Sequence, residues 1–202
     1  MPPAETEISE ELVIALLHEQ HPDLATRRVR FESEGWDNAI FRLGDDLAVR
    51  LPRRAMNAAM LADELRWLPV LAPALPLPVN AAVHTGVPGC GYPWAWSITP
   101  WFPGASWADA DVVDGAAAAR VLGAFVRALA VDAPDDAPTN PYRGGPLAER
   151  DRAVRERVAQ VGSSIDADAV FRLWDNALAT PAATQRQWVH GDLHPANIVV
   201  HE

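Results

Sequence analysis

The sequence predicts an α+β protein with two lobes, a β-rich lobe followed by a helical one. Short extended runs separated by turn-forming residues occupy most of the chain before Gly104. Longer segments with apolar residues at helical spacing follow it. The 202 residues are 49% hydrophobic, so they can bury a substantial core. We therefore expect residues 1–103 to form the first lobe and residues 104–202 to form part of the second.

The first lobe should begin with a helix and continue with three antiparallel strands. Ser9 precedes two glutamates and a set of leucines at helical spacing, a pattern typical of a helix N-terminus. The strands are expected at Val29–Ser33, Ala39–Leu43 and Leu47–Leu51. The two segments between them are rich in glycine, aspartate and asparagine, so the strands should form a meander.

A second helix and a further strand should complete this lobe. Apolar residues at helical spacing predict a helix over Ala55–Leu68, which should stop at Pro69 because proline lacks the N–H that continues a helix. The proline-rich stretch Pro73–Val79 should run extended into His84. The aromatic segment Tyr92–Trp101 predicts another strand.

The second half of the chain should be mainly helical. Helices are expected over Val112–Val131, Pro146–Val161 and Asp168–Leu178. The segment Asp132–Pro146 is rich in aspartate, proline and glycine, so we expect it to form an ordered connector.

The charge composition narrows the classes of partner. The chain has 17 basic residues, all of them arginine, and 27 acidic residues, which gives a net charge of −10. This balance argues against binding to nucleic acid or to an anionic membrane. It is compatible with a cationic ligand, and equally with a simple contribution to solubility.

The sequence favours a cytoplasmic protein. No basic residue precedes Arg27, so the N-terminus lacks the charge of a secretory or transit peptide, and no apolar stretch is long enough to span a membrane. Cys90 is the only cysteine and cannot form a disulfide within the chain, so a reducing compartment is the default. Its two neighbours are glycines, and we interpret it as a turn residue.

The sharpest functional signal runs from His190 to Asn197 and reads His-Gly-Asp-Leu-His-Pro-Ala-Asn. Phosphoryl transfer needs a carboxylate to accept the proton of the attacking hydroxyl and an oxygen ligand for Mg²⁺. The four residues between Asp192 and Asn197 can fold back so that both side chains face one phosphate. The segment resembles the HGDxxxxN catalytic loop of the aminoglycoside phosphotransferase family, small-molecule kinases related in fold to protein kinases. This resemblance implies that Asp192 is the catalytic base, that His190 braces the loop and that Asn197 binds Mg²⁺.

Two other interpretations of this segment are open. It could be a buried turn that contains these residue types without any function. Alternatively, a hydrolase could use its polar side chains as metal ligands, namely His190, Asp192, His194 and His201. Gly191 and Pro195 suit a loop better than a strand, and no further cluster of histidine or cysteine completes a metal site.

Other segments match the same family in the same order along the chain. Gly35, Asp37 and Asn38 lie between the first two expected strands, where the family places the loop that covers the nucleotide phosphates. The segment lacks a full GxGxxG pattern, and a hairpin turn would need no such function.

A cationic residue is expected beside this loop. Arg50, on the third expected strand, stands where the family directs a positive charge toward the α- and β-phosphates, although lysine is the common kinase residue. Arg53 or Arg54 could reach the phosphates instead. The resemblance implies that an acid on the following helix holds Arg50, and Glu64 and Asp63 are the candidates. Adjacent residues on a helix point about 100° apart, so only one of them can face the site, and the apolar neighbours of Glu64 place it near the buried edge.

The segment Ser97–Gly104 resembles the hinge of the family, where backbone groups bind the purine of ATP or GTP. On this alignment Thr99 is the gatekeeper, Pro100 offers its C=O and Phe102 offers its N–H. The segment Asn140–Pro146 would approach the acceptor site.

Together these features predict an enzyme that uses ATP or GTP with Mg²⁺ to phosphorylate a hydroxyl of a small molecule, such as an aminoglycoside, a macrolide or another cationic acceptor. The alternative is a nucleotide-binding or interaction module that has lost the chemistry. In the family a second Mg²⁺ ligand follows the catalytic loop, whereas this chain has five residues after Asn197. We therefore expect the 202 residues to be a truncated enzyme without activity of its own. We also expect self-association through the unpaired apolar strand Ile198–Val200.

Overall fold

The structure, a computed structural model, describes residues 2–110, 114–139, 143–181 and 185–201. The chain forms two compact units. The first, here called the sheet unit, comprises Met1–Ala128 and Pro195–Glu202, and the second, the hairpin unit, comprises Leu129–His194. Among the described residues, every helix is too short or too polar to cross a bilayer. The α+β class predicted from the sequence is confirmed.

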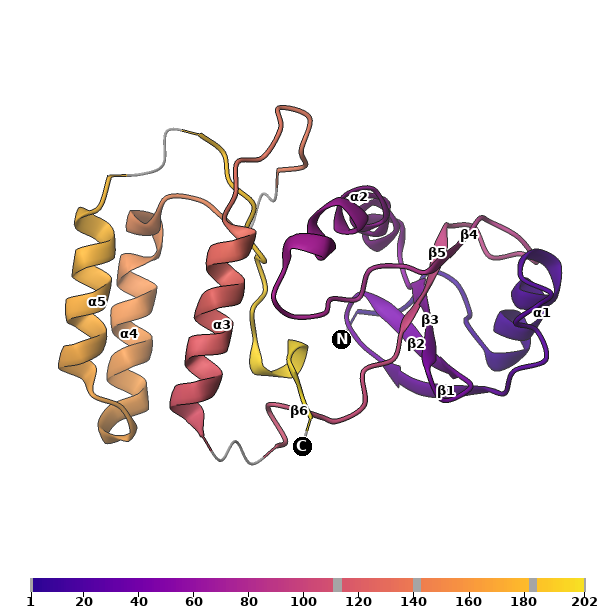
Figure 1. The fold of residues 1–202 in the computed structure, drawn as a ribbon, viewed down its shortest axis with the longest axis horizontal. Helices are drawn as coiled ribbons and strands as arrows, with labels where there is room; N and C mark the ends of the chain where they lie inside the picture. The colour runs from indigo at the N-terminus through magenta and orange to yellow at the C-terminus, as the bar shows by residue number, and fades with distance from the viewer. Residues whose placement is uncertain (1, 111–113, 140–142, 182–184, 202) are drawn as a thin grey trace. The chain divides into compact units, whose positions relative to one another are not determined.

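An antiparallel sheet forms the centre of the sheet unit (Figure 1). Its strands are β1 (Val29–Glu34), β2 (Asn38–Leu43), β3 (Leu47–Pro52), β4 (His84–Gly86) and β5 (Trp96–Pro100). They lie in the order β1-β2-β3-β5-β4. The first three strands form the predicted meander, and each predicted boundary lies within about one residue of the observed one.

One face of the sheet packs against helix α1 (Glu10–Gln20) and holds the apolar core. Side chains alternate between the two faces of a strand, so every second residue of β2 and β3 points to this face. The core comprises Val13, Leu16 and Leu17 of α1, Ala39, Phe41, Leu43, Val49, Leu51, Trp96 and Ile98 of the sheet, and Leu24 and Tyr92 of the connecting segments. Ser9 caps α1 as predicted, because its hydroxyl accepts the N–H of Leu12 at 3.3 Å.

Helix α2 (Ala55–Leu71) lies on the opposite face of the sheet. Arg50 alternates with the core residues Val49 and Leu51, and its side chain meets Glu64 of α2. The helix buries Asn57 and Leu61. The sheet thus has an apolar face toward α1 and a face toward α2 that carries charged residues.

The prediction that α2 stops before Pro69 is wrong. A proline in the last turns of a helix removes only one N–H donor, so the other backbone hydrogen bonds of the helix can still form. Beyond Pro69, the N–H of Ala72 donates to the C=O of Leu68. The chain then enters the 3₁₀ turn η1 (Ala72–Ala74). The first residues of the predicted extended stretch, including Pro73, therefore belong to this turn.

Strand β5 also begins later than predicted, at Trp96 instead of Tyr92. Tyr92 pairs through its backbone with Gly89 and closes a turn around Cys90, which has a φ of +48°. The prediction of Cys90 as a turn residue is confirmed. The Tyr92 hydroxyl is buried and donates to the C=O of Pro52 at 2.7 Å, and burial raises the pKa of Tyr92.

The rest of the sheet unit comprises β6 (Ala105–Ser106), the 3₁₀ turn η4 (Pro195–Asn197), β7 (Val199–Val200) and most of α3 (Gly115–Leu129). Residues 111–113, where α3 was predicted to begin, lie outside the described residues. β7 pairs with β6, so the expectation of an unpaired strand near the C-terminus is wrong. Gly104 allows this close approach. It has a φ of +132°, and a Cβ there would lie 2.2 Å from the carbonyl oxygen of Val200.

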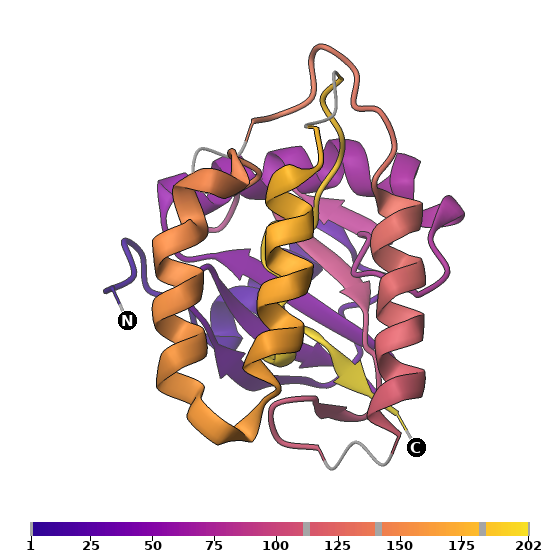
Figure 2. The ribbon, with the colours of Figure 1, turned by 90° about the vertical axis from the view of Figure 1, so that its left-hand side faces the viewer.

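In the hairpin unit, α4 (Asp151–Val161) and α5 (Ala167–Ala179) lie side by side (Figures 1 and 2). The 3₁₀ turn η2 (Leu147–Arg150) leads into α4, and η3 (Gly162–Ser164) joins the two helices. Part of the segment predicted as one helix from Pro146 is thus 3₁₀. In the described part of the connector, Arg186 donates to the carbonyls of Asp135 and Ala137 and to the Thr139 hydroxyl.

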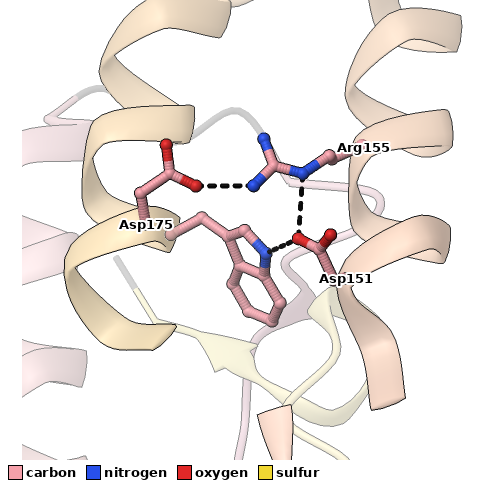
Figure 3. A network of polar contacts seen from close by, with 4 residues as sticks. Asp151, Arg155 and Asp175 are labelled. Carbon is pink, nitrogen blue, oxygen red and sulfur yellow. Dashed lines mark hydrogen bonds and ion pairs between the residues drawn. The ribbon is translucent and has the colours of Figure 1, made fainter. Parts of the chain in front are cut away.

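A polar network joins α4 to α5 (Figure 3). The guanidinium of Arg155 donates to the Asp151 carboxylate at 2.9 Å and to the Asp175 carboxylate at 2.5 Å. The indole N–H of Trp174 donates to the same Asp151 oxygen at 2.7 Å. The hydrogen bonds that Arg155 donates to Asp175 and Asp151, with the charges of both carboxylates, raise the pKa of Arg155 above its ordinary value.

Candidate active site

Arg50 forms an ion pair with Glu64 at 3.0 Å. The strand β3 supplies the arginine and the helix α2 supplies the carboxylate. The Arg50 side chain is 15% exposed, so the pair lies partly out of solvent. The prediction of Glu64, rather than Asp63, as the partner of Arg50 is confirmed.

The face of the sheet that carries Arg50 also carries the residues of the expected hinge. Arg50 lies opposite Ser97 in the β3–β5 ladder, and Ala48 lies opposite Thr99. Both Ser97 and Thr99 are almost wholly buried. Thr99 therefore lies on the same face of the sheet as the Arg50–Glu64 pair. It stands on the adjacent strand β5, two residues after Ser97.

The backbone after Thr99 leaves two polar groups without a hydrogen-bond partner among the described residues. The N–H of Trp101 donates to the C=O of Asp46 at 2.8 Å, so Trp101 directs its polar groups toward β3. Successive residues of an extended chain direct these groups to alternate sides. The C=O of Pro100, at the end of β5, therefore faces the other side, and neither it nor the N–H of Phe102 is bonded to another described residue.

The loop between β1 and β2 is closed by the N–H of Gly35, which donates to the C=O of Asn38 at 2.9 Å. The carboxylate of Asp37 accepts the side-chain N–H of Asn57, on the first turn of α2, at 2.6 Å. Asp37 is thus engaged by the protein. The interpretation of Gly35, Asp37 and Asn38 as nucleotide-binding residues stays a prediction.

Arg53 does not offer the alternative phosphate contact considered from the sequence. Arg53 is 3% exposed. Its guanidinium pairs with Glu34 and donates to the carbonyls of Pro2 and Gly35, each at 3.2 Å. Arg54 reaches the carbonyl of Trp36 at 3.5 Å. The phosphate role of Arg50 stays a prediction.

His190 and Asp192 lie in the hairpin unit. The backbone N–H of Asp192 donates to Nδ1 of His190 at 3.3 Å, so the imidazole braces the turn as predicted. Gly191 between them has a φ of +77°, a conformation that glycine adopts most readily. Arg143 donates to the C=O of Gly191 at 2.8 Å, and its guanidinium lies 3.7 Å from the Asp192 carboxylate.

Asn197 lies in η4, which belongs to the sheet unit. The Ser106 hydroxyl donates to the C=O of Pro195 at 3.3 Å, and the N–H of Trp107 donates to the C=O of Ile198 at 2.8 Å. Both ends of the turn are thus fixed to the segment that follows the hinge. The amide oxygen of Asn197 is a hard donor, of the kind that Mg²⁺ takes together with phosphate oxygens and water. Its chemistry therefore fits the ion.

The sheet unit contains most of the predicted site residues, and several of them are in contact. It holds Gly35, Asp37, Asn38, Arg50, Glu64, Thr99, Pro100, Phe102 and Asn197. Residues 140–142 of the segment expected near the acceptor lie outside the described residues. Among the described residues, no three side chains of His, Cys, Asp or Glu come together as a metal site. A surface hollow of about 150 Å³ contains none of the predicted residues; it is lined by Arg28, Arg30, Gly44 and Asp45.

Sequence reasoning missed the supporting roles of Arg53, Asn57 and Arg143. An arginine directly after β3 looks like a surface residue, and nothing in its spacing reveals that it turns back to the loop between β1 and β2. Asn57 stands in the first turn of α2, where a polar side chain commonly caps its own helix. The pairing of Arg143 with Asp192 joins positions 49 residues apart, which no local pattern indicates.

The comparison with protein families gives one match that spans most of the chain. A model described as the phosphotransferase enzyme family matches residues 28–202. No curated protein matches the chain.

Solved structures of phosphotransferases share the fold. The GDP complex of wild-type aminoglycoside 2′-phosphotransferase-IIIa has a TM-score of 0.66 at 17% identity, with 96% of this chain and 68% of that chain covered. A GDP and kanamycin complex of an APH(2″) enzyme has a TM-score of 0.64 at 20% identity, with 94% and 67% covered. The macrolide 2′-phosphotransferase MphH from Brachybacterium faecium has a TM-score of 0.55 at 25% identity, with 96% and 68% covered.

Proposed function

Because the chain belongs to the phosphotransferase enzyme family, we propose that it transfers the γ-phosphoryl group of ATP or GTP to a hydroxyl group of a small molecule. The reaction is proposed for the protein that carries this chain. The observation that carries the proposal is the 3.0 Å ion pair between Arg50 and Glu64, on the same face of the sheet as the expected hinge.

This ion pair suits an arginine that binds phosphate. Arg50 projects from a strand whose neighbours are fixed in the apolar core, and Glu64 limits the positions of its guanidinium. An arginine held in this way can donate to phosphate oxygens at a smaller loss of side-chain entropy than a free one. The geometry supports a role toward the α- and β-phosphates.

The purine would bind to backbone groups of the hinge. The C=O of Pro100 and the N–H of Phe102 form no hydrogen bond with another described residue. An acceptor followed two residues later by a donor is complementary to the edge of a purine. Thr99 would border the base on the side of the sheet.

The chemistry would rest on Asp192, whose carboxylate would accept the proton of the acceptor hydroxyl. The backbone N–H of this residue donates to His190, and the guanidinium of Arg143 lies 3.7 Å from its carboxylate. Asn197 would be a ligand of Mg²⁺, which, when bound, neutralises charge on the transferred phosphoryl group.

The acceptor is proposed to be a cationic small molecule. The net charge of −10 favours amines over anions in long-range attraction. Structures of the same fold include a kanamycin complex of an aminoglycoside enzyme and a macrolide enzyme, and both classes of acceptor carry amines. We therefore propose an aminoglycoside or a macrolide as acceptor, and cytoplasm as the compartment.

Substitution of Arg50 tests the nucleotide site. In the full product of the gene, Arg50→Ala removes a charge-assisted contact worth about 1.5–3 kcal/mol, so the Kd for ATP or GTP in the presence of Mg²⁺ should rise about 10- to 100-fold. Isothermal titration calorimetry measures this change.

Two adjacent carboxylates supply a matched comparison. Glu64→Gln frees Arg50 from its partner and should weaken triphosphate binding by about two- to fivefold, as expected for a partly exposed ion pair. Asp63→Asn, one residue along α2, should leave the Kd unchanged. Equal nucleotide affinity for wild type and Arg50→Ala would contradict the assignment.

A further inference from the structure

Arg53 is a buried residue that contacts both ends of the loop between β1 and β2. At the beginning of the loop, its guanidinium pairs with Glu34 and donates to the C=O of Gly35 at 3.2 Å. At the end of the loop, its backbone N–H donates to the C=O of Asp37 at 3.0 Å. The residue itself is 3% exposed. A single buried arginine thus bonds to the loop before and after its tip.

These bonds determine where the remaining backbone groups of the loop point. Arg53 takes the carbonyls of Gly35 and Asp37, and Arg54 takes the carbonyl of Trp36 at 3.5 Å. In a trans peptide the N–H of the next residue points opposite to the carbonyl, and no described peptide bond is cis. The N–H groups of Trp36 and Asp37 are therefore directed away from the two arginines, and neither donates to another described residue.

Asn57 and the N-terminal segment support this arrangement. Asn57, also 3% exposed, holds the Asp37 carboxylate at 2.6 Å. The C=O of Pro2 accepts a hydrogen bond from Arg53 at 3.2 Å, and the N–H of Glu5 donates to the C=O of Arg53 at 2.9 Å. The Glu5 carboxylate then accepts the N–H of Ala55 at 3.0 Å, at the start of α2. Residues 2–5 precede the part of the chain matched by the family model, residues 28–202.

We propose that Arg53 is a positioning residue that presents the N–H groups of Trp36 and Asp37 to the phosphates of the bound nucleotide. This role rests on the proposed function, since it requires that the loop covers a nucleotide. Arg53 itself does not touch the phosphates, because its guanidinium is engaged by Glu34, Gly35 and Pro2. Its effect on the nucleotide passes through the backbone of the loop.

Only arginine can make this set of contacts. The planar guanidinium has donors on separate nitrogens, so one nitrogen can pair with Glu34 while another serves the two carbonyls. A lysine ammonium is a compact charge, and it would keep the pair with Glu34 but lose most of the hydrogen bonds to the carbonyls. Arg53→Lys therefore keeps the positive charge but removes most of the hydrogen bonds that position the loop.

The test compares a nucleoside triphosphate with the nucleoside alone in the full gene product. If Arg53 positions the loop, Arg53→Lys should weaken binding of the triphosphate about tenfold, which corresponds to the loss of one or two hydrogen bonds. Binding of adenosine or guanosine should stay unchanged, because the hinge binds the base and the loop does not. Calorimetry with both ligands gives the two affinities, and Arg53→Gln should show the same split.

A second measurement needs no nucleotide. Hydrogen–deuterium exchange of residues 35–38 should become faster in Arg53→Lys, while the core strands keep their protection. Arg30→Lys is the matched control, since Arg30 lies on the same sheet in an exposed pair with Glu32 at 3.4 Å. It should change neither the exchange nor either affinity.

The outcomes distinguish the proposal from the function on which it rests. Wild-type protein that binds neither ATP nor GTP would contradict the proposed function and this role with it. Wild-type binding with an Arg53→Lys variant that is unchanged, or that loses nucleoside and triphosphate affinity equally, would overturn only the role of Arg53. Loss of the sheet in the circular dichroism of both Arg53 variants would assign the residue to folding and would also overturn it.

Discussion

The sheet unit and the hairpin unit differ in how many large apolar side chains they bury. In the sheet unit, large apolar residues such as Phe41, Trp96 and Ile98 are almost wholly buried. In the described part of the hairpin unit, the buried hydrophobic residues are Leu129, Ala137 and Val158. There the contact between α4 and α5 includes the Asp151–Arg155–Asp175 network, whose charged side chains are 37–57% exposed.

This difference explains where polar side chains can be held in fixed positions. An apolar core holds the strands of the sheet unit, so Arg50 and Arg53 project from a backbone that cannot move without disturbing the core. Ion pairs that remain exposed to water contribute less to stability, and salt weakens them. We therefore expect single substitutions to have large effects at the core of the sheet unit and moderate effects in the hairpin unit.

The largest effect is expected at Gly86, which lies opposite Trp96 in the β4–β5 ladder. A Cβ at this position would lie 1.9 Å from the Trp96 ring, and that ring is fully buried and cannot move aside. Gly86→Ala should therefore lower the free energy of unfolding by about 3 kcal/mol. Urea unfolding followed by circular dichroism measures the change.

A second glycine provides the control for this substitution. Gly123 lies in α3, and a Cβ there would have no atom within 4 Å. Gly123→Ala should raise the free energy of unfolding by about 1 kcal/mol, because alanine favours the helix. If the two substitutions had effects of the same sign, the clash with Trp96 would not explain the first.

A moderate effect is expected from the network of the hairpin unit. Asp151→Ala leaves the Trp174 N–H and one N–H of Arg155 without their acceptor, and should lower the free energy of unfolding by about 1–2 kcal/mol. Asp151→Asn keeps an acceptor oxygen and should cost less than half as much. Arg152→Ala removes a highly exposed pair with Glu156 and should change the stability by at most about 0.5 kcal/mol. Equal losses of stability for all three variants would show that the network does not stabilise the hairpin unit.

The smallest effect is a dependence on pH at the surface of the sheet unit. A hydrogen bond from the Arg27 side chain holds the pKa of Asp46 below its ordinary value. The Asp46 carboxyl therefore has a lower pKa in the folded protein than in the unfolded chain. The Arg27–Asp46 pair stabilises the folded state at pH values above about 4, and this stabilisation is lost as the pH falls through the folded pKa. Asp46→Asn should make the acid side of the stability curve slightly flatter, whereas Asp45→Asn should not. A steeper acid side would contradict the assignment.

Much of the fold could be predicted because its signals are local. Turn-forming residues delimit the three strands of the meander, and Ser9 marks the start of α1. The errors arose where tertiary context outweighs local preference. Helix α2 tolerates Pro69 because only its last turns are affected, and Tyr92 joins a turn with Gly89 although its sequence favours a strand.

The candidate site could be predicted in part for the same reason. The family resemblance predicted an acidic partner for Arg50, and the helical neighbours of Glu64, which are a local feature, selected this residue over Asp63. The roles of Arg53 and Asn57 depend on contacts between a loop and residues 18–20 positions away, on a different element. Such contacts follow from the register of β2 with β3, which no single motif specifies.

The central claim is that Asp192 is the base of a phosphotransferase whose nucleotide site includes Arg50. The most direct measurement is phosphoryl transfer by the full gene product to a panel of aminoglycosides and macrolides, with wild type and Asp192→Asn compared in parallel. Asparagine keeps the size of aspartate but cannot accept the proton, so turnover should fall about 10²–10⁴-fold while the Kd for nucleotide stays unchanged. Near wild-type turnover by Asp192→Asn, or wild-type protein that binds nucleotide and phosphorylates no acceptor, would contradict the claim.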